Sequence, residues 1–101
     1  MTPQVLELLT YRLQPGLTPD GFLAIVAITL PALERHPGLL ARTLTHQDGA
    51  WTETIRWTSQ AHADAAGLAI MADPAVAPLM QALDPASLTM RFVPVLWHKD
   101  G

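Results

Sequence analysis

The sequence predicts an α+β fold in which two helices cover one face of a four-stranded antiparallel sheet. Three features lead to this prediction. Apolar segments with strand-like or helix-like spacing follow in the order strand, helix, strand, strand, helix, strand. An Asp48-Gly49 pair, which favours a tight turn, joins the two middle strands. Each helical segment begins after a residue whose side chain caps helices. The length of the chain predicts one domain over residues 1–101.

The first strand is predicted over residues 5–13, which are rich in apolar and strand-favouring side chains, and it ends at the turn 14–16. A helix then begins at Thr18-Pro19-Asp20, which supplies a hydroxyl cap, proline in the first turn and an acidic side chain near the positive end of the helix dipole. Its apolar face is expected to contain Phe22, Ile25, Val26, Leu30 and Leu33.

The middle strands are predicted over residues 39–45 and 51–57, and the Asp48-Gly49 turn makes them a hairpin. Thr58 or Ser59 caps an alanine-rich helix that runs from residue 60 to 71. Asp73-Pro74 interrupts this helix and restarts it, because it again places a cap before a proline. Residues 84–87 form a turn, residues 88–97 the fourth strand and residues 98–101 a loose tail, so the core spans about residues 5–97.

This order of elements is the ferredoxin-like βαββαβ arrangement. The first strand is apolar on both of its faces, with Val5 and Leu9 on one and Leu6 and Leu8 on the other. A sheet with one face in water would alternate instead, so both faces are expected to be covered. The two helices cover one face, and the sheet of a second copy is the simplest cover for the other. The sequence therefore predicts a homodimer.

Composition excludes several classes of protein. The chain has 101 residues, half of them hydrophobic, a net charge of −3 and only six scattered Lys and Arg residues. This charge pattern does not favour nonspecific nucleic-acid binding, which depends on neutralising phosphates. It has no cysteine and hence no disulfide or thiolate metal site. The longest uncharged apolar stretch, residues 21–33, is too short for a membrane helix and contains Pro31. No secretory signal is recognisable, so a cytoplasmic location is expected.

Several local motifs carry a resemblance to a known family. They are LQPG at 13–16, PGLL at 37–40, WTS at 57–59, MADP at 71–74 and DPAS at 84–87. With these motifs in this order over about residues 5–96, the chain resembles the dimeric α/β-barrel superfamily and, within it, the antibiotic biosynthesis monooxygenase-like domains. The resemblance implies a dimeric barrel and no cofactor. It leaves the activity open, because the superfamily includes cofactor-free monooxygenases, haem-degrading enzymes, lactone isomerases and stress-induced proteins.

One branch of the superfamily does not fit. Its haem-degrading members combine an asparagine on the first strand, a tryptophan at the end of the third strand and a histidine on the second helix. Trp57 matches the tryptophan, whereas the other two positions correspond to Leu9 and a site near Gly67. Haem degradation is therefore not expected. The first strand also has no asparagine or histidine, which weakens a direct transfer of the polyketide-oxidising mechanism.

Glu7 and Tyr11 are the candidate catalytic residues. Glu7 lies in an apolar strand, where an unpaired buried carboxylate is costly. Either it forms a structural ion pair with Arg42, Arg56 or Arg91, or it acts as a general base or hydrogen-bond acceptor for a ligand. Tyr11 has the same parity on the strand and would bring a phenol to the same cavity, unless its hydroxyl meets water at the outer edge.

The candidate substrate-binding residues are Trp51, Trp57 and Phe22. Trp51, Glu53, Ile55 and Trp57 share one face of their strand, and by the resemblance Trp57 faces the cavity between sheet and helices. These aromatic side chains either fill the core or form a stacking wall for a planar ligand. The pairs His46 with Asp48 and His62 with Asp64 are too common by chance to indicate a metal site, and none is expected.

Two functions therefore remain from the sequence. The first is a cofactor-independent monooxygenase or isomerase that acts on an aromatic or polyketide-like molecule. The second is a noncatalytic small-molecule-binding or stress-associated dimer. A cavity of ~300 Å³ or more would favour a ligand site, and a filled core would favour the structural class.

Overall fold

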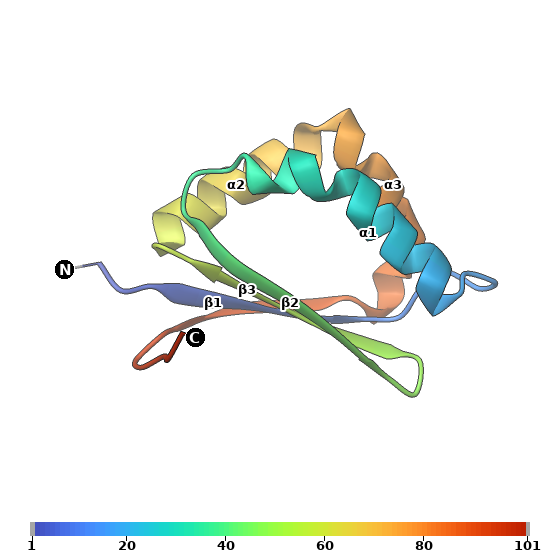
Figure 1. The fold of residues 1–101 in the computed structure, drawn as a ribbon, viewed down its shortest axis with the longest axis horizontal. Coiled ribbons are helices and arrows are strands. Elements are labelled where there is room, and N and C mark those ends of the chain that lie inside the picture. Colours follow the sequence, from blue (N-terminus) through green and yellow to red (C-terminus); the bar gives the residue numbers. More distant parts are fainter. Residues whose placement is uncertain (1, 101) are drawn as a thin grey trace.

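The computed structural model describes residues 2–100 and has the predicted order of elements (Figure 1). The strands pair in the order β2-β3-β1-β4 with every neighbouring pair antiparallel, and the helices lie on one face of the sheet. The predicted α+β, ferredoxin-like fold class is confirmed. The elements are β1 (Val5–Tyr11), α1 (Pro19–Glu34), β2 (Leu39–Gln47), β3 (Ala50–Trp57), α2 (Gln60–Ala72), a 3-10 turn (Pro74–Val76), α3 (Ala77–Ala82), a second 3-10 turn (Pro85–Ser87) and β4 (Thr89–Pro94).

The helix starts are the ones that the capping residues predict. The Thr18 hydroxyl accepts a hydrogen bond of 3.0 Å from the backbone N–H of Gly21, and Ser59 accepts one of 3.2 Å from His62. Each bond satisfies a backbone donor that has no partner within the helix. Asp73 caps the short turn that leads into α3 in the same way. The strand bounds differ from the predicted ones at several ends. Strands β1 and β4 stop before residues 13 and 97, whereas β2 and β3 run closer to the hairpin turn than predicted, to residue 47 and from residue 50.

The β2–β3 hairpin fixes which side chains face the helices. Asp48 and Gly49 have φ values of 53° and 79°, the left-handed pair that a two-residue hairpin turn requires. Counting back from this turn places Arg42 opposite Ile55. A bulge between Leu39 and Ala41 then reverses the alternation, so that Leu39 stays on the side of the helices.

The core lies between the sheet and the helices. One cluster surrounds Phe22 and Trp51, and a second surrounds Trp57 beneath α2. The buried side of α1 differs in part from the expected one, because Thr29 and Ala32 are buried while Leu30 is exposed. Thr29 is accommodated because its hydroxyl donates within the helix, toward the carbonyl oxygens of Ile25 and Val26.

The opposite face of the sheet, the outer face, has no helix of the described chain over it (Figure 1). Leu6, Leu8 and Val93 are half-buried there, next to threonine side chains of neighbouring strands. The end of the chain turns back beneath this face, where Asp100 pairs with Arg56 at 2.8 Å. The outer face thus has both apolar and polar side chains, and the end of the described chain covers only part of it.

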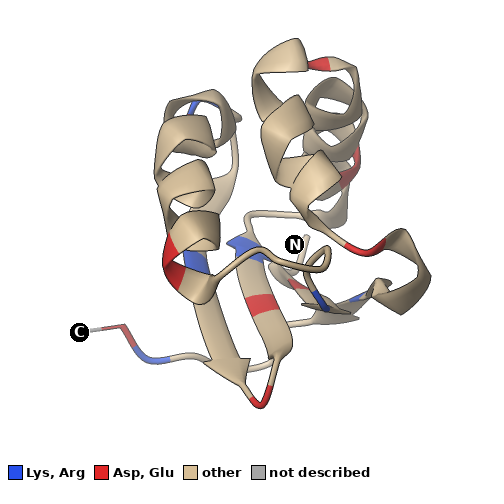
Figure 2. Cartoon of the chain, turned by 90° about the vertical axis from the view of Figure 1, so that its right-hand side faces the viewer, with Lys and Arg blue, Asp and Glu red and all other residues tan. Residues whose placement is uncertain are grey.

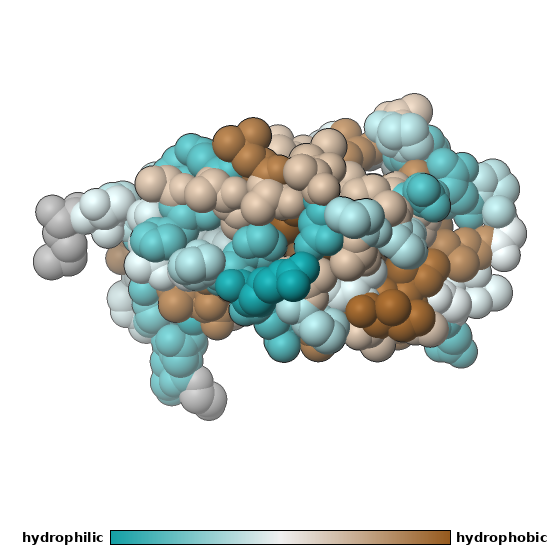
Figure 3. All heavy atoms as spheres, turned by 90° about the horizontal axis from the view of Figure 1, so that it is seen from above, coloured by the Kyte–Doolittle hydropathy of each residue, from teal (hydrophilic) through white to brown (hydrophobic). Residues whose placement is uncertain are grey.

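Apolar side chains also lie on the surface of the helical layer. Figure 3, which looks down on the helices, shows brown residues at that surface, and Ile28 and Leu68 are among the exposed ones. Within residues 2–100, no single helix is long and apolar enough to cross a membrane; α2 and Pro74–Ala82 meet the length and composition criteria only as a pair bent by 81°. Both members of this pair contribute buried side chains to the core.

Candidate functional site

Five side chains on the face of the sheet that the helices cover are hydrogen-bonded to one another, in one group of two and one group of three, and we call them the inner polar cluster. Strand alternation places them there from three neighbouring strands. Figure 2 shows charged positions on the strands below the helices and a few on the helices themselves. The cluster consists of Glu7 and Tyr11 from β1, Arg42 from β2, and Glu53 and Trp57 from β3.

Glu7 and Trp57 form a direct pair across the two central strands. The indole Nε1 of Trp57 donates a hydrogen bond of 2.9 Å to Oε1 of Glu7. Trp57 is only 2% exposed, while Glu7 is half-buried. Burial raises the pKa of the Glu7 carboxyl above its ordinary value; the bond from Trp57 opposes this rise, and the charge of Glu53 adds to it. Glu7 is therefore an oriented carboxylate that binds a proton more readily than a free one.

Among residues 2–100, the ion pair considered for Glu7 is not formed. Arg42 pairs instead with Glu53, through a contact of 2.6 Å between Nε and Oε2. Arg56 pairs with Asp100, and Arg91 lies opposite Leu8 on the outer face. The interpretation of Glu7 as a structural partner of an arginine is therefore wrong, because the arginines face other groups.

Tyr11 points inward and not toward water. Its hydroxyl donates a hydrogen bond of 3.0 Å to Oε1 of Glu53, and its side chain is buried. Burial, together with the charge of Glu53 and the bond to it, raises the pKa of Tyr11 well above its ordinary value. The phenol is thus a fixed donor to Glu53. Among residues 2–100, it forms no hydrogen bond with Glu7.

Arg42 and Glu53 are the members of the cluster that the sequence did not predict as site residues. The side chain of Arg42 is 10% exposed and that of Glu53 9%. Beyond the bond from Nε, the terminal nitrogens Nη1 and Nη2 of Arg42 are buried without a hydrogen-bond partner among residues 2–100. Counting outward from the Asp48-Gly49 turn could have found Arg42, since this register places it two positions from the partner of Glu53, on the same face.

Phe22 and Trp51, two of the expected substrate contacts, pack on each other in the core. Their ring centroids are 4.8 Å apart with the planes at 65°, and Phe22 is completely buried. Tyr11 meets the edge of Phe22 at 5.9 Å. This edge-to-face arrangement stabilises the core and leaves the faces of these rings occupied by other side chains.

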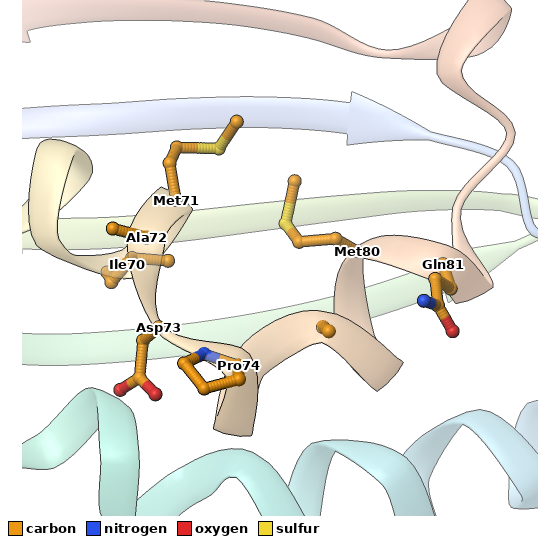
Figure 4. A pocket seen from close by; sticks show the side chains of 8 residues that line it. Ile70, Met71, Ala72, Asp73, Pro74, Met80 and Gln81 are labelled. Carbon is orange, nitrogen blue, oxygen red and sulfur yellow. The ribbon is translucent and has the colours of Figure 1, made fainter.

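Several hollows of about 290–610 Å³ open at the surface. A groove of about 610 Å³ lies along α1 and β2 and includes Arg42 in its lining. A smaller hollow of about 320 Å³ lies at the bend between α2 and α3, where Figure 4 shows Met71 and Met80 on the same side and Asp73 directed away from them. Neither hollow is lined by Glu7 or Trp57.

One histidine pairs with a carboxylate: Nδ1 of His98 lies 3.3 Å from Oδ2 of Asp100. Among residues 2–100 there is no group of three or more His, Asp and Glu side chains that could hold a metal ion. The ring of His46 lies over Trp51 with centroids 4.7 Å apart, and Nδ1 of His62 lies 2.7 Å from the hydroxyl of Ser59. Each of these two rings therefore has a structural contact of its own.

Comparison by sequence found no matching protein-family model and no matching curated protein. Comparison by structure found proteins of the same fold. SnoaB, a cofactor-independent oxygenase from Streptomyces nogalater, is 20% identical with a TM-score of 0.65, and the match covers 98% of this chain and 97% of SnoaB. A protein from Chloroflexus aurantiacus, provisionally assigned as an antibiotic biosynthesis monooxygenase, is 18% identical with a TM-score of 0.71 over 96% of this chain and 97% of its own.

A third similar structure has no assigned function. It is the NE2512 protein of Nitrosomonas europaea, 16% identical with a TM-score of 0.69, and the match covers 99% of this chain and 96% of that one. At such identities the likeness concerns the fold. The resemblance inferred from the sequence motifs is confirmed at that level: this chain has the ferredoxin-like fold of the antibiotic biosynthesis monooxygenase-like proteins.

Proposed function

We propose that the chain is the subunit of a cytoplasmic, homodimeric, cofactor-independent oxygenase that acts on an aromatic or polyketide-like small molecule. The observation that carries the proposal is the Trp57–Glu7 pair, an oriented carboxylate with a raised pKa on the inner face of the sheet. Such perturbed carboxylates are typical of general bases. The fold that the chain shares with a cofactor-independent oxygenase supports the same activity.

Glu7 is the proposed general base. Because Trp57 binds Oε1, the second oxygen of Glu7 is the one available to receive a proton from the substrate. The raised pKa brings the carboxylate closer to the operating pH, where proton transfer is most effective. The indole fixes the carboxylate, so it is a positioning residue in this scheme.

The reaction needs no group other than the substrate and oxygen. Removal of a proton from a methylene that lies between two aromatic rings and opposite a ring carbonyl gives an electron-rich carbanion, which molecular oxygen oxidises. Overall, the methylene loses two hydrogens and gains one oxygen atom to become a carbonyl, and the second oxygen atom leaves with both hydrogens as water. The enzyme supplies the base, and the proposal requires the substrate to lie beside Glu7.

A second copy on the outer face completes the proposed assembly. Leu6, Leu8 and Val93 give that face an apolar centre that the described part of the chain leaves without a helix. Covering this centre with an identical sheet would remove apolar surface from water in both copies.

One observation favours the alternative, a noncatalytic small-molecule-binding or stress-associated dimer. Phe22, Trp51 and Trp57 are packed into the core and do not line the groove along α1 and β2 or the hollow between α2 and α3. A structural role for the inner polar cluster requires that side chains, and not a ligand, fill the space beside it. In that case Glu7 and Trp57 would serve to fix the register of the central strands.

Oxygen uptake separates the two functions. Anthrone has an activated methylene and is a simple tricyclic probe. The oxygenase predicts that the protein accelerates oxygen consumption and anthraquinone formation above the rate in buffer, with one oxygen molecule used for each quinone formed. Glu7→Gln should lower this rate roughly a hundredfold or more. Uptake no faster than in buffer, with a small molecule that co-purifies with the dimer in native mass spectrometry, would support the noncatalytic alternative.

A further inference from the structure

The guanidinium of Arg42 is nine-tenths buried and is bonded to the protein at one nitrogen only. Nε donates to Oε2 of Glu53 at 2.6 Å, while Nη1 and Nη2 are buried with no partner among the residues that the structure describes. These two nitrogens carry four N–H donors. Buried donors are nearly always hydrogen-bonded, and each exception calls for an explanation.

Arg42 also lines the groove along α1 and β2. The groove has a volume of about 610 Å³, within the range of roughly 300–1,000 Å³ that small-molecule sites occupy. Arg42 is its only basic residue, and Glu34 is its only acidic one. The remaining lining is aliphatic and consists of Val26, Leu30, Leu33, Leu39, Leu40, Ala41 and Leu44.

We propose that this groove binds a small monocarboxylate with an apolar body, whose carboxylate is held by Nη1 and Nη2 of Arg42. Glu53 occupies the Nε side of the guanidinium, so the edge formed by the two terminal nitrogens is the free one. Two N–H groups on this edge point in nearly parallel directions and match the two oxygens of a carboxylate. The aliphatic lining fits the apolar body and offers it no hydrogen bonds.

The charges around Arg42 allow it to bind the carboxylate of a ligand in addition to that of Glu53. The hydroxyl of Tyr11 donates to Oε1 of Glu53, so the negative charge of Glu53 is held by two donors and does not depend on Arg42 alone. Glu34 is exposed, so water weakens its repulsion of a bound anion. Because Nη1 and Nη2 are buried, the side chains that cover them must move before a carboxylate reaches them.

This site does not depend on the oxygenase. Arg42 is on β2, toward the edge of the sheet, whereas Glu7 is on the central strand β1 and does not line the groove. A carboxylate could bind at Arg42 whether or not Glu7 acts as a base. The test below therefore measures binding and not oxygen uptake.

Isothermal titration of the full chain with octanoate and with octanamide tests the proposal. The two probes share an apolar chain and differ in the charge of the head group. We expect octanoate to bind at least tenfold more tightly than octanamide. Arg42→Lys keeps a positive charge for Glu53 but loses the paired donors, so octanoate affinity should fall roughly ten- to a hundredfold while octanamide affinity stays unchanged. Arg12→Lys, a change at an exposed arginine outside the groove, should bind both probes like the wild type.

Glu34→Gln provides a second variant that does not touch the buried ion pair. Removing this exposed charge should strengthen octanoate binding by roughly two- to fivefold and leave octanamide binding unchanged, which keeps the proposal testable if Arg42→Lys fails to fold. Equal affinity of the wild type for octanoate and octanamide, or no binding of octanoate, would overturn the proposal. So would a crystal structure in octanoate in which Nη1 and Nη2 of Arg42 are bonded to water alone.

Discussion

The indole of Trp57 donates a hydrogen bond of 2.9 Å to the carboxylate of Glu7 across the two central strands of the sheet. Trp57 lies opposite Val5, so the bond runs diagonally along the inner face. It satisfies the one donor of a buried indole and fixes a carboxylate that has no arginine partner in the described structure. Glu7 therefore combines a fixed position with a raised pKa.

Glu7→Gln should not destabilise the fold at neutral pH. The raised pKa means that the folded state binds the proton of Glu7 more tightly than the unfolded chain does. The contribution of Glu7 to stability is thus complete below its ordinary pKa of 4.5 and is lost as the pH rises through the raised value. Glutamine keeps an acceptor for Trp57 and carries no charge. We expect its melting temperature to match the wild type at pH 4 and to equal or exceed it at pH 7.

Glu53→Gln is the matched control for that change. Glu53 also lies on the inner face but is paired with Arg42, so its neutralisation leaves a buried guanidinium without a counter-charge. Breaking a buried ion pair in this way typically costs about 3–5 kcal/mol. A drop in melting temperature at pH 7 as large for Glu7→Gln as for Glu53→Gln would show that Glu7 has an ionic partner after all.

Trp57→Phe should weaken the fold and raise the pKa of Glu7 further. The substitution keeps a ring in the core but removes the donor that favours the charged carboxylate. Leaving a half-buried acceptor unpaired typically costs about 1–3 kcal/mol in the free energy of unfolding. Urea unfolding at pH 7 measures this loss. It should be smaller at pH 4, where Glu7 is protonated in both proteins, and a loss that does not depend on pH would argue against the Trp57–Glu7 bond.

Tyr11 should not ionise while the protein is folded. It is the only tyrosine in the chain, so its absorbance at 295 nm reports one group. Burial and the negative charge of Glu53 raise its pKa above the ordinary 10.0. Its contribution to stability is therefore retained up to that pH and lost only above it. Tyrosinate absorbance should stay flat at pH 10.5 and rise together with the loss of circular dichroism. A rise centred near pH 10 in the folded protein would place the hydroxyl in water.

Leu8→Glu should separate the proposed dimer into monomers. Leu8 lies in the half-buried centre of the outer face, opposite Arg91 on β4, so a single subunit can accommodate the new carboxylate. Burying that charge against a second sheet would be costly. Light scattering behind a sizing column at micromolar concentration should give about twice the 11.0 kDa chain mass for the wild type and 11.0 kDa for Leu8→Glu.

Leu68→Glu, a change on the exposed surface of α2, should keep the dimeric mass. A wild type of 11.0 kDa would contradict the proposed dimer. A Leu8→Glu variant that stays dimeric would mean that the copies meet through another surface.

Local signals in the sequence were sufficient for the fold. Thr18, Ser59 and Asp73 cap the helical segments, and Asp48-Gly49 forms the left-handed hairpin turn. These features depend on a few neighbouring residues, which a sequence displays directly. Strand parity and the central position of β1 and β3 predict that Glu7 and Trp57 face the same side of the sheet, and the structure confirms this. The hydrogen bond between them was not predicted.

The partners of the charged residues could not be predicted in the same way. Glu7, Glu53, Arg42, Arg56 and Arg91 allow several pairings, and the one adopted depends on the register of β2 and on its bulge between residues 39 and 41. Burial of the aromatic rings depends on packing between distant segments, so Phe22 and Trp51 looked equally suited to a ligand wall and to a core. Side-chain packing decides such cases, and local spacing does not.

The central claim is that Glu7 acts as a base on the inner face of the sheet, and the pH dependence of oxygen uptake tests it most directly. With anthrone as the probe, kcat/KM of the wild type should rise with pH and level off, with an apparent pKa above the 4.5 of an ordinary glutamate. Glu7→Gln should remove this step and lower the plateau by roughly a hundredfold or more. Trp57→Phe should move the step to higher pH. Catalysed oxygen uptake with the same profile in Glu7→Gln as in the wild type would contradict the claim.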